Sequence, residues 1–193
     1  MLPVEKRINS KSDLKEWLDV ELRAYNVGAL QRIFPFGETA ILRKHQILLR
    51  KTEYYLNTNK KTRSFLYRLR LSVVQNKYAM HVAKNCCGKG LRIMHVGPIL
   101  MNSRVCVGEN CIVHMNSALV AGGNNDDVPT LGNGVIVGYG AVVLGNVTVA
   151  DNVAIGANAV VNRDVLEENI AVAGVPAKKI SNNGAIAWLN RAN

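Results

Sequence analysis

Aromatic residues are scarce in this sequence, making up 6% of its 193 residues, although 48% of the chain is hydrophobic. This composition suits a thin aliphatic core better than a bulky globular one. No apolar run approaches the roughly 20 residues that a membrane-spanning helix needs. The first residues, MLPVEKRINSKSD, also lack the apolar stretch of a signal peptide. These absences predict a cytoplasmic protein, with a peripheral position at the inner face of the membrane as an alternative.

Metal-site patterns are also missing. The four cysteines, Cys86, Cys87, Cys106 and Cys111, show no spacing typical of a metal site, and no CxxC pattern occurs. Adjacent Cys86 and Cys87 are poorly placed to bridge each other. We therefore expect reduced, structural thiols and no bound metal.

Acidic residues are almost absent from residues 43–92. This stretch holds thirteen Lys or Arg residues against one acid, Glu53, in a chain whose net charge is +10. Such a block suits an anionic partner, either membrane lipid, a phosphorylated glycan carrier or an acidic polysaccharide, and a solvated helix face is the competing interpretation. Nucleic acid is not expected as a partner, because no known binding motif accompanies the charge.

A period of six residues dominates the second half of the chain. An α-helix repeats at 3.6 residues and a strand at 2, so neither element alone explains this period. It favours stacked three-sided coils with six residues per side and one aliphatic side chain per side pointing inward. Nine of the ten positions in this register are aliphatic: Val107, Val113, Leu119, Leu131, Val137, Val143, Val149, Ile155 and Val161.

Helical patterns flank the repeats. Ser12 can cap a first helix, and further helices are predicted over 38–56 and 61–76, after a break at Phe34-Pro35-Phe36-Gly37. A short terminal helix is expected to cap the coil stack. The predicted organisation is an α-helical region 1–78, a β-helical domain 79–181 and a C-terminal capping tail 182–193.

Residues 122–129 are too polar to form an ordinary side of a coil. Leu119 and Leu131 nevertheless keep the register across them, which indicates a loop extruded from a rigid scaffold, a frequent location for functional residues. Asp126 and Asp127 in this loop could bind substrate hydroxyls. A solvated loop is the competing interpretation.

Four segments resemble the hexapeptide-repeat acyltransferases, which have a left-handed parallel β-helix, and specifically their serine acetyltransferase branch. The similarity covers about residues 79–181. The segments are GKGLRIMH ending at His95, the pair Gly122-Gly123, LGNGVIVG from Leu131 to Gly138, and AGVPAKKI ending at Ile180. The resemblance implies a mainly β fold with an α-helical N-terminal region.

His95 matches the general base of this family. The resemblance implies that it removes a proton from a substrate hydroxyl while that oxygen attacks the thioester of acetyl-CoA, a function that suits the pKa range of imidazole. His114 lies near a coil corner and is a second candidate for catalysis or substrate binding, with an interface position as the alternative. His45 and His81 are expected to be structural or exposed.

The resemblance also implies a homotrimer, with a dimer of trimers as a larger alternative. Acetyl-CoA would lie between two β-helices, held largely by backbone groups that small residues expose. The implied contacts are Gly122 and Gly123 near the thioester, Tyr139, Gly140 and Ala157 along the pantetheine arm, and Arg163 and Lys178 near the nucleotide phosphates.

Several matching positions depart from the family pattern. Counted without gaps, the carboxylate that orients the base falls on Met80, and the acid before the base becomes Met94. The Arg-His pair that holds the carboxylate of serine falls on Asp127 and Val128. Because an acid should repel that carboxylate, we predict an O-acetyltransferase that acts on a sugar hydroxyl in surface or capsular polysaccharide biosynthesis. The alternatives are a serine O-acetyltransferase of cysteine biosynthesis and a non-catalytic β-helical binding scaffold.

Overall fold

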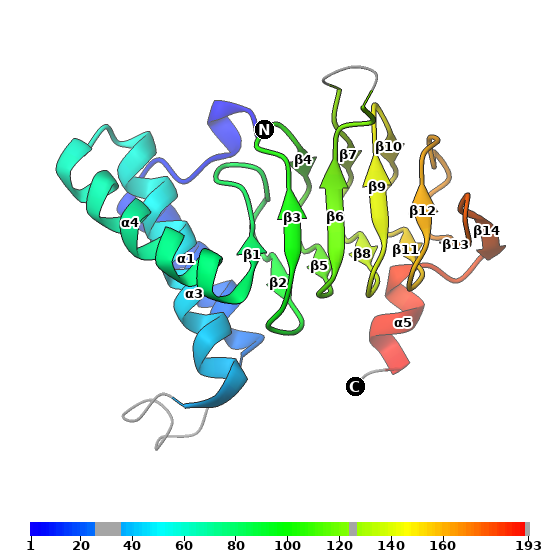
Figure 1. The fold of residues 1–193 in the computed structure, drawn as a ribbon, viewed down its shortest axis with the longest axis horizontal. Coiled ribbons are helices and arrows are strands. Elements are labelled where there is room, and N and C mark those ends of the chain that lie inside the picture. Colours follow the sequence, from blue (N-terminus) through cyan, green and yellow to red (C-terminus); the bar gives the residue numbers. More distant parts are fainter. Residues whose placement is uncertain (26–35, 124–126, 192–193) are drawn as a thin grey trace.

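A computed structural model of the protein describes residues 1–25, 36–123 and 127–191. A short 3-10 turn, η1 (Val4–Lys6), comes first. The helices are α1 (Lys11–Arg23), α3 (Gly37–Asn57) and α4 (Lys61–Tyr78) before the strands and α5 (Ala185–Arg191) after them. Figure 1 shows α1, α3 and α4 gathered at the β1 end of a stack of strands.

The strands form three sheets that run along the stack. The first sheet contains β1 (Met80–His81), β3 (Ile99–Met101), β6 (Ser117–Val120), β9 (Val142–Leu144) and β12 (Val160–Val161). The second contains β4 (Cys106–Val107), β7 (Thr130–Leu131) and β10 (Thr148–Val149). The third contains β2 (Arg92–Ile93), β5 (Ile112–Val113), β8 (Ile136–Val137), β11 (Ala154–Ile155), β13 (Ala171–Ala173) and β14 (Lys178–Ser181).

The chain visits the first, second and third sheets in turn, so each coil has three sides (Figure 1). Neighbouring strands pair in parallel, apart from β13 with β14, which pair antiparallel. The predicted left-handed parallel β-helix with an α-helical N-terminal region is confirmed.

The nine aliphatic residues of the six-residue register all point into the coil. Each has an exposed fraction of 2% or less. Full burial of one such side chain contributes about 1.5–3 kcal/mol relative to leaving it in water. The register therefore sets the core, and Leu119 and Leu131 keep it on either side of the polar loop.

Glycines at the corners are required by close stacking of the coils. A Cβ on Gly108 would lie 2.5 Å from the backbone carbonyl of Gly132, and one on Gly138 would lie 2.6 Å from the carbonyl oxygen of Ile155. Neither glycine has a positive φ. The spacing between coils, rather than an unusual turn conformation, therefore excludes a side chain at these positions.

The start of α1 differs from the predicted cap. Ser10 is the N-cap: its side chain accepts a hydrogen bond from the backbone N–H of Asp13 at 3.0 Å, and the Asp13 carboxylate accepts one from the Ser10 N–H at 2.9 Å. These reciprocal bonds form a capping box. Ser12 lies inside the first turn because Asp13, at the third helical position, selects Ser10 as its partner.

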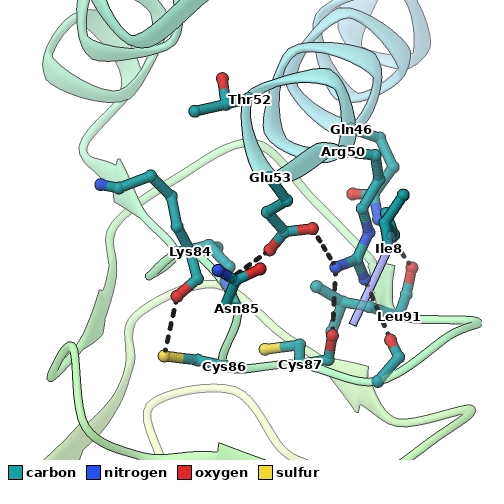
Figure 2. Close-up of polar contacts among 12 residues, drawn as sticks. Ile8, Gln46, Arg50, Thr52, Glu53, Lys84, Asn85, Cys86, Cys87 and Leu91 are labelled. Atoms are coloured by element: carbon teal, nitrogen blue, oxygen red, sulfur yellow. Dashed lines mark hydrogen bonds and ion pairs between the residues drawn. The ribbon is translucent and has the colours of Figure 1, made fainter. Parts of the chain in front are cut away.

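A buried ionic network fixes α3 to the first coil (Figure 2). The Arg50 guanidinium lies 2.7 Å from a carboxylate oxygen of Glu21 and 2.8 Å from one of Glu53, and it donates to the Cys87 carbonyl at 3.1 Å. Glu53 also accepts the backbone N–H of Asn85 at 2.7 Å. Breaking a buried pair of this kind costs about 3–5 kcal/mol, because a charge is left without compensation.

Helix α5 does not cover the end of the stack as the capping prediction expects. Ala185 packs instead on the outer face of the third sheet, in one cluster with Ile112 and Ile136, and Met94 and Leu189 pack against that cluster. These two isoleucines point outward next to inward-pointing valines, so they need cover from outside the coil. Among the helices that the structure describes, none is both long enough and apolar enough to cross a membrane.

Candidate functional site

The site lies along the edge where the chain turns from the third sheet into the first. We call this edge the histidine corner; it consists of residues 94–98, 114–116, 138–141 and 156–159. Strands β2, β5, β8 and β11 pair in register, so the residues that follow them lie in successive layers. His95 and His114 therefore come from neighbouring coils.

The two histidine rings lie close together, with centroids 6.4 Å apart. The His95 side chain is 52% exposed, and His114 is partly buried. Burial lowers the pKa of His114 below its ordinary value, and electrostatic interaction with the His95 ring and with Arg92 lowers this pKa further. This shift favours the neutral form of the His114 ring, while His95 presents its ring to solvent.

A carboxylate from another part of the chain contacts His95. Glu38, in the first turn of α3, places one carboxylate oxygen 3.3 Å from the His95 Nδ1. Its other oxygen accepts the backbone N–H of Val96 at 2.7 Å. The second bond fixes the carboxylate beside the ring, and Glu38 thereby occupies the position of an orienting group. Met80, onto which the family's carboxylate falls, is fully buried in the core.

The sequence predicts that Glu38 lies at the start of a helix, but it does not predict the contact of Glu38 with His95. The acid follows the break at Phe36-Gly37, which signals the helix start. The contact, however, joins residues 57 positions apart, and one sequence does not reveal how α3 packs on the coil.

A cleft of about 280 Å³ adjoins His114 along the histidine corner. It is lined mainly by small and apolar residues, with Tyr139 as its largest aromatic side chain. The Tyr139 hydroxyl accepts a hydrogen bond from the Asn116 side chain at 2.5 Å. Two predicted acetyl-CoA contacts, Tyr139 and Ala157, line this cleft, and Gly140 follows Tyr139 in the same corner.

Other predicted contacts lie elsewhere. Gly122, Gly123 and Arg163 follow strands of the first sheet, at the corner where the chain turns into the second sheet. Figure 1 shows that the end of β6 that leads toward β7 lies on the opposite edge of the stack from the turns between β2 and β3 and between β8 and β9. Lys178 is exposed in β14, opposite Ala173. One chain therefore does not bring the predicted cofactor residues together.

Asp127, the one described residue of the two predicted hydroxyl-binding acids, also lies away from the histidine corner. Asp127 is exposed at the corner that holds Gly122, and Asp126 lies outside the described residues. His81 is exposed, whereas His45 is fully buried in α3. Burial lowers the pKa of His45 to about 4, so its ring is neutral at pH 7. Within the described ranges, no group of three His, Cys, Asp or Glu residues is arranged to hold a metal ion.

Known proteins resemble this chain in sequence and in fold. The family described as bacterial transferase hexapeptide (six repeats) matches residues 129–163. A serine acetyltransferase of Synechococcus elongatus is 37% identical over 99 residues, which cover 50% of this chain and 40% of that protein. The predicted resemblance to hexapeptide-repeat acyltransferases of the serine acetyltransferase-like branch is confirmed. The chain spans about half the length of the curated relatives that it matches.

Solved structures share the fold. Serine acetyltransferase of Neisseria gonorrhoeae in complex with serine has a TM-score of 0.64 and 24% identity, over 89% of this chain and 71% of that one. A serine acetyltransferase in complex with CoA has a TM-score of 0.59 and 21% identity, over 88% and 71% of the two chains.

The prediction of a sugar acceptor and a function in polysaccharide biosynthesis is contradicted by these comparisons. The relatives are named serine acetyltransferases, and one of the similar structures binds serine. The wrong prediction came from counting the serine clamp onto Asp127 and Val128 without gaps. That count passes through residues 122–129, where the six-residue register does not fix the alignment, and residues 124–126 lie outside the described ranges.

Proposed function

We propose that this protein is an acetyl-CoA-dependent serine O-acetyltransferase. The observation that carries the proposal is the arrangement of His95 with the Glu38 carboxylate at its Nδ1 and His114 on the next coil. The named relatives and the serine complex of a similar fold support serine as the acceptor. The CoA complex of another supports acetyl-CoA as the donor.

In this proposal His95 acts as the general base. A hydrogen bond from Nδ1–H to Glu38 leaves Nε2 with a lone pair, which takes the proton of the serine hydroxyl. The serine oxygen attacks the thioester carbonyl carbon and forms the ester bond, and the carbon–sulfur bond breaks. The imidazolium returns its proton to the departing thiolate, so CoA leaves as a thiol. The carboxylate stabilises the imidazolium between these two transfers.

The cleft beside His114 suits the pantetheine arm of acetyl-CoA. That arm is slender and uncharged, and the cleft, with a volume of about 280 Å³, is lined with small apolar residues near Tyr139 and Ala157. Arg163 and Lys178 are exposed and positively charged, as contacts to nucleotide phosphates require. We propose a homotrimer, because packing one coil against another would bring the corner with Gly122 and Arg163 of one copy toward the histidine corner of its neighbour.

Arg92 is the cation that we assign to the serine carboxylate. It lies on β2, three residues before His95, and its charge acts on His114. The residue is partly buried, so its charge is less screened than that of a fully exposed side chain. Arg92 can therefore substitute for the cationic clamp that Asp127 and Val128 do not provide.

Incubating the purified protein with acetyl-CoA and L-serine tests this function. O-acetylserine should form, detected by mass analysis, together with one equivalent of free CoA thiol. His95→Ala should lower the rate about 10²–10⁴-fold, as expected for losing a general base, whereas His81→Ala, at an exposed histidine on β1, should not. Absence of O-acetylserine with the wild-type protein would overturn the assigned acceptor. Equal rates for wild type and His95→Ala would overturn the assigned base.

A further inference from the structure

Helix α4 has two apolar faces, and one of them points into solvent. Leu71 and Val74 are buried against the rest of the protein. On the opposite face, four large hydrophobic residues are exposed: Phe65 (59%), Leu66 (48%), Leu69 (50%) and Val73 (68%). At 3.6 residues per turn these four side chains form one stripe along the helix. Scattered exposed apolar residues are ordinary, but a continuous stripe opposite the core indicates a binding surface.

Cations border this stripe on both sides. On a helical projection, Arg70 and Lys77 lie along one border, and Lys61 and Arg68 lie along the other. Helix α4 contains no acidic residue over its 18 positions. Exposed Phe and Leu side chains flanked by Lys and Arg are also found on helices that lie in the plane of a membrane interface. In α4 the opposite face is apolar too and packs against the protein, so only the outer face has this composition.

A groove between α3 and α4 continues the same surface. Its volume is about 840 Å³, and five basic residues line it: Arg43, Lys44, Lys51, Arg70 and Lys77. Apolar side chains, among them Ile41, Leu48 and Val74, also contribute to its lining. None of its lining residues is acidic. An apolar groove with a basic rim suits a ligand that combines a hydrocarbon chain with an anionic group.

The single acid of the basic block does not neutralise this surface. Glu53 is 1% exposed and is paired with Arg50 inside the protein. The positive charges of the exposed basic residues in this block therefore add, and together they attract an anionic partner toward α4. A second copy of the chain would bring cations against cations, which disfavours self-association through this face.

We propose that the outer face of α4, with the adjoining groove, binds the surface of an anionic phospholipid bilayer. The stripe from Phe65 to Val73 inserts among the acyl chains near the headgroups. The bordering Lys and Arg residues contact the phosphates, their long stems lying along the apolar layer. This binding does not rest on the acetyl transfer proposed above, because none of the residues that form the stripe or line the groove belongs to the histidine corner.

Co-sedimentation of the full chain with vesicles tests this proposal. The protein should bind vesicles of phosphatidylglycerol and phosphatidylcholine, bind weakly to phosphatidylcholine alone, and be released as salt is raised. The double variant Arg70→Glu, Lys77→Glu should lower partitioning by about 25-fold or more, since each cation near an anionic surface contributes about fivefold. Phe65→Ser with Leu69→Ser should also weaken binding.

The matched control is Lys15→Glu with Leu166→Ser, which changes an exposed cation on α1 and an exposed apolar residue of the coil. This control should bind vesicles like the wild type, and circular dichroism should show that all variants melt alike. Equal binding to both vesicle types, or wild-type binding by the Arg70→Glu, Lys77→Glu variant, would overturn the proposal. A smaller assembly for Phe65→Ser, Leu69→Ser in light scattering would overturn it too, by showing that a second copy covers this face.

Discussion

Replacing Glu38 by glutamine tests how the base is oriented. The amide of the Glu38→Gln variant can still accept the Val96 N–H, so the helix start keeps its contact with the coil. It loses the charge that faces His95 Nδ1 at 3.3 Å. A charge-assisted hydrogen bond contributes about 1.5–3 kcal/mol. Because both side chains are about half exposed, water screens the pair and the lower end applies. We expect kcat to fall about tenfold.

The assay measures release of the CoA thiol while the concentrations of serine and acetyl-CoA are varied separately. It distinguishes a slower chemical step from weaker binding of either substrate. The kcat should fall while both KM values stay near those of the wild type, because Glu38 contacts the base and neither substrate. Nitrogen-15 NMR of labelled histidine should show a changed tautomer balance for His95 alone. Glu109→Gln, at an exposed acid on the coil, is the control. The reasoning fails if Glu38→Gln keeps the wild-type kcat, or if its KM rises in place of a fall in kcat.

Three further outcomes follow from the structure. His45 has a pKa of about 4 in the folded protein against 6.5 in the unfolded chain, so between these pH values only the unfolded chain binds a proton at this residue. Urea titrations should therefore show the free energy of unfolding fall by about 3 kcal/mol from pH 7 to pH 4. The His45→Gln variant should not show this fall. Arg50→Met should lower the free energy of unfolding at pH 7 by about 3–5 kcal/mol, because Glu21 and Glu53 become uncompensated; a loss under about 1 kcal/mol would contradict the network's assigned contribution. Arg92→Met should raise the KM for serine about tenfold or more and leave that for acetyl-CoA unchanged; equal changes in both would remove Arg92 from the acceptor site.

The coil could be predicted from the sequence because its signal is local and repeated. Val107, Val113 and the later members of the register each report the same environment, so one exception does not hide the pattern. Helix positions followed from apolar spacing and chain breaks. The exact start of α1 did not, because Ser10 and Ser12 both precede Asp13 closely enough to suggest a cap, and only the side-chain geometry distinguishes them.

The site was harder to predict than the coil. His95 carries a motif that a sequence can display, whereas Glu38 reaches it only through the packing of α3 on the coil. The acceptor predicted from Asp127 was wrong for a related reason: the six-residue register does not define individual positions within residues 122–129, so a count through them gives little information about the acceptor. The position of α5 was also hidden, since its apolar residues suit the end of the stack as well as the outer face of Ile112 and Ile136.

The ionic network around Arg50 has a consequence for how this protein can be divided. Glu38 and Arg50 belong to α3 and lie twelve residues apart, or about 18 Å along the helix axis. Arg50 binds the helix to the first coil through the Cys87 carbonyl, and Glu38 in the first turn contacts His95. A shortened chain that begins at Met80 would retain the stacked coils but leave His95 without its carboxylate. Under the proposed function, the unit that folds as a repeat is thus smaller than the unit that holds the base together with its carboxylate.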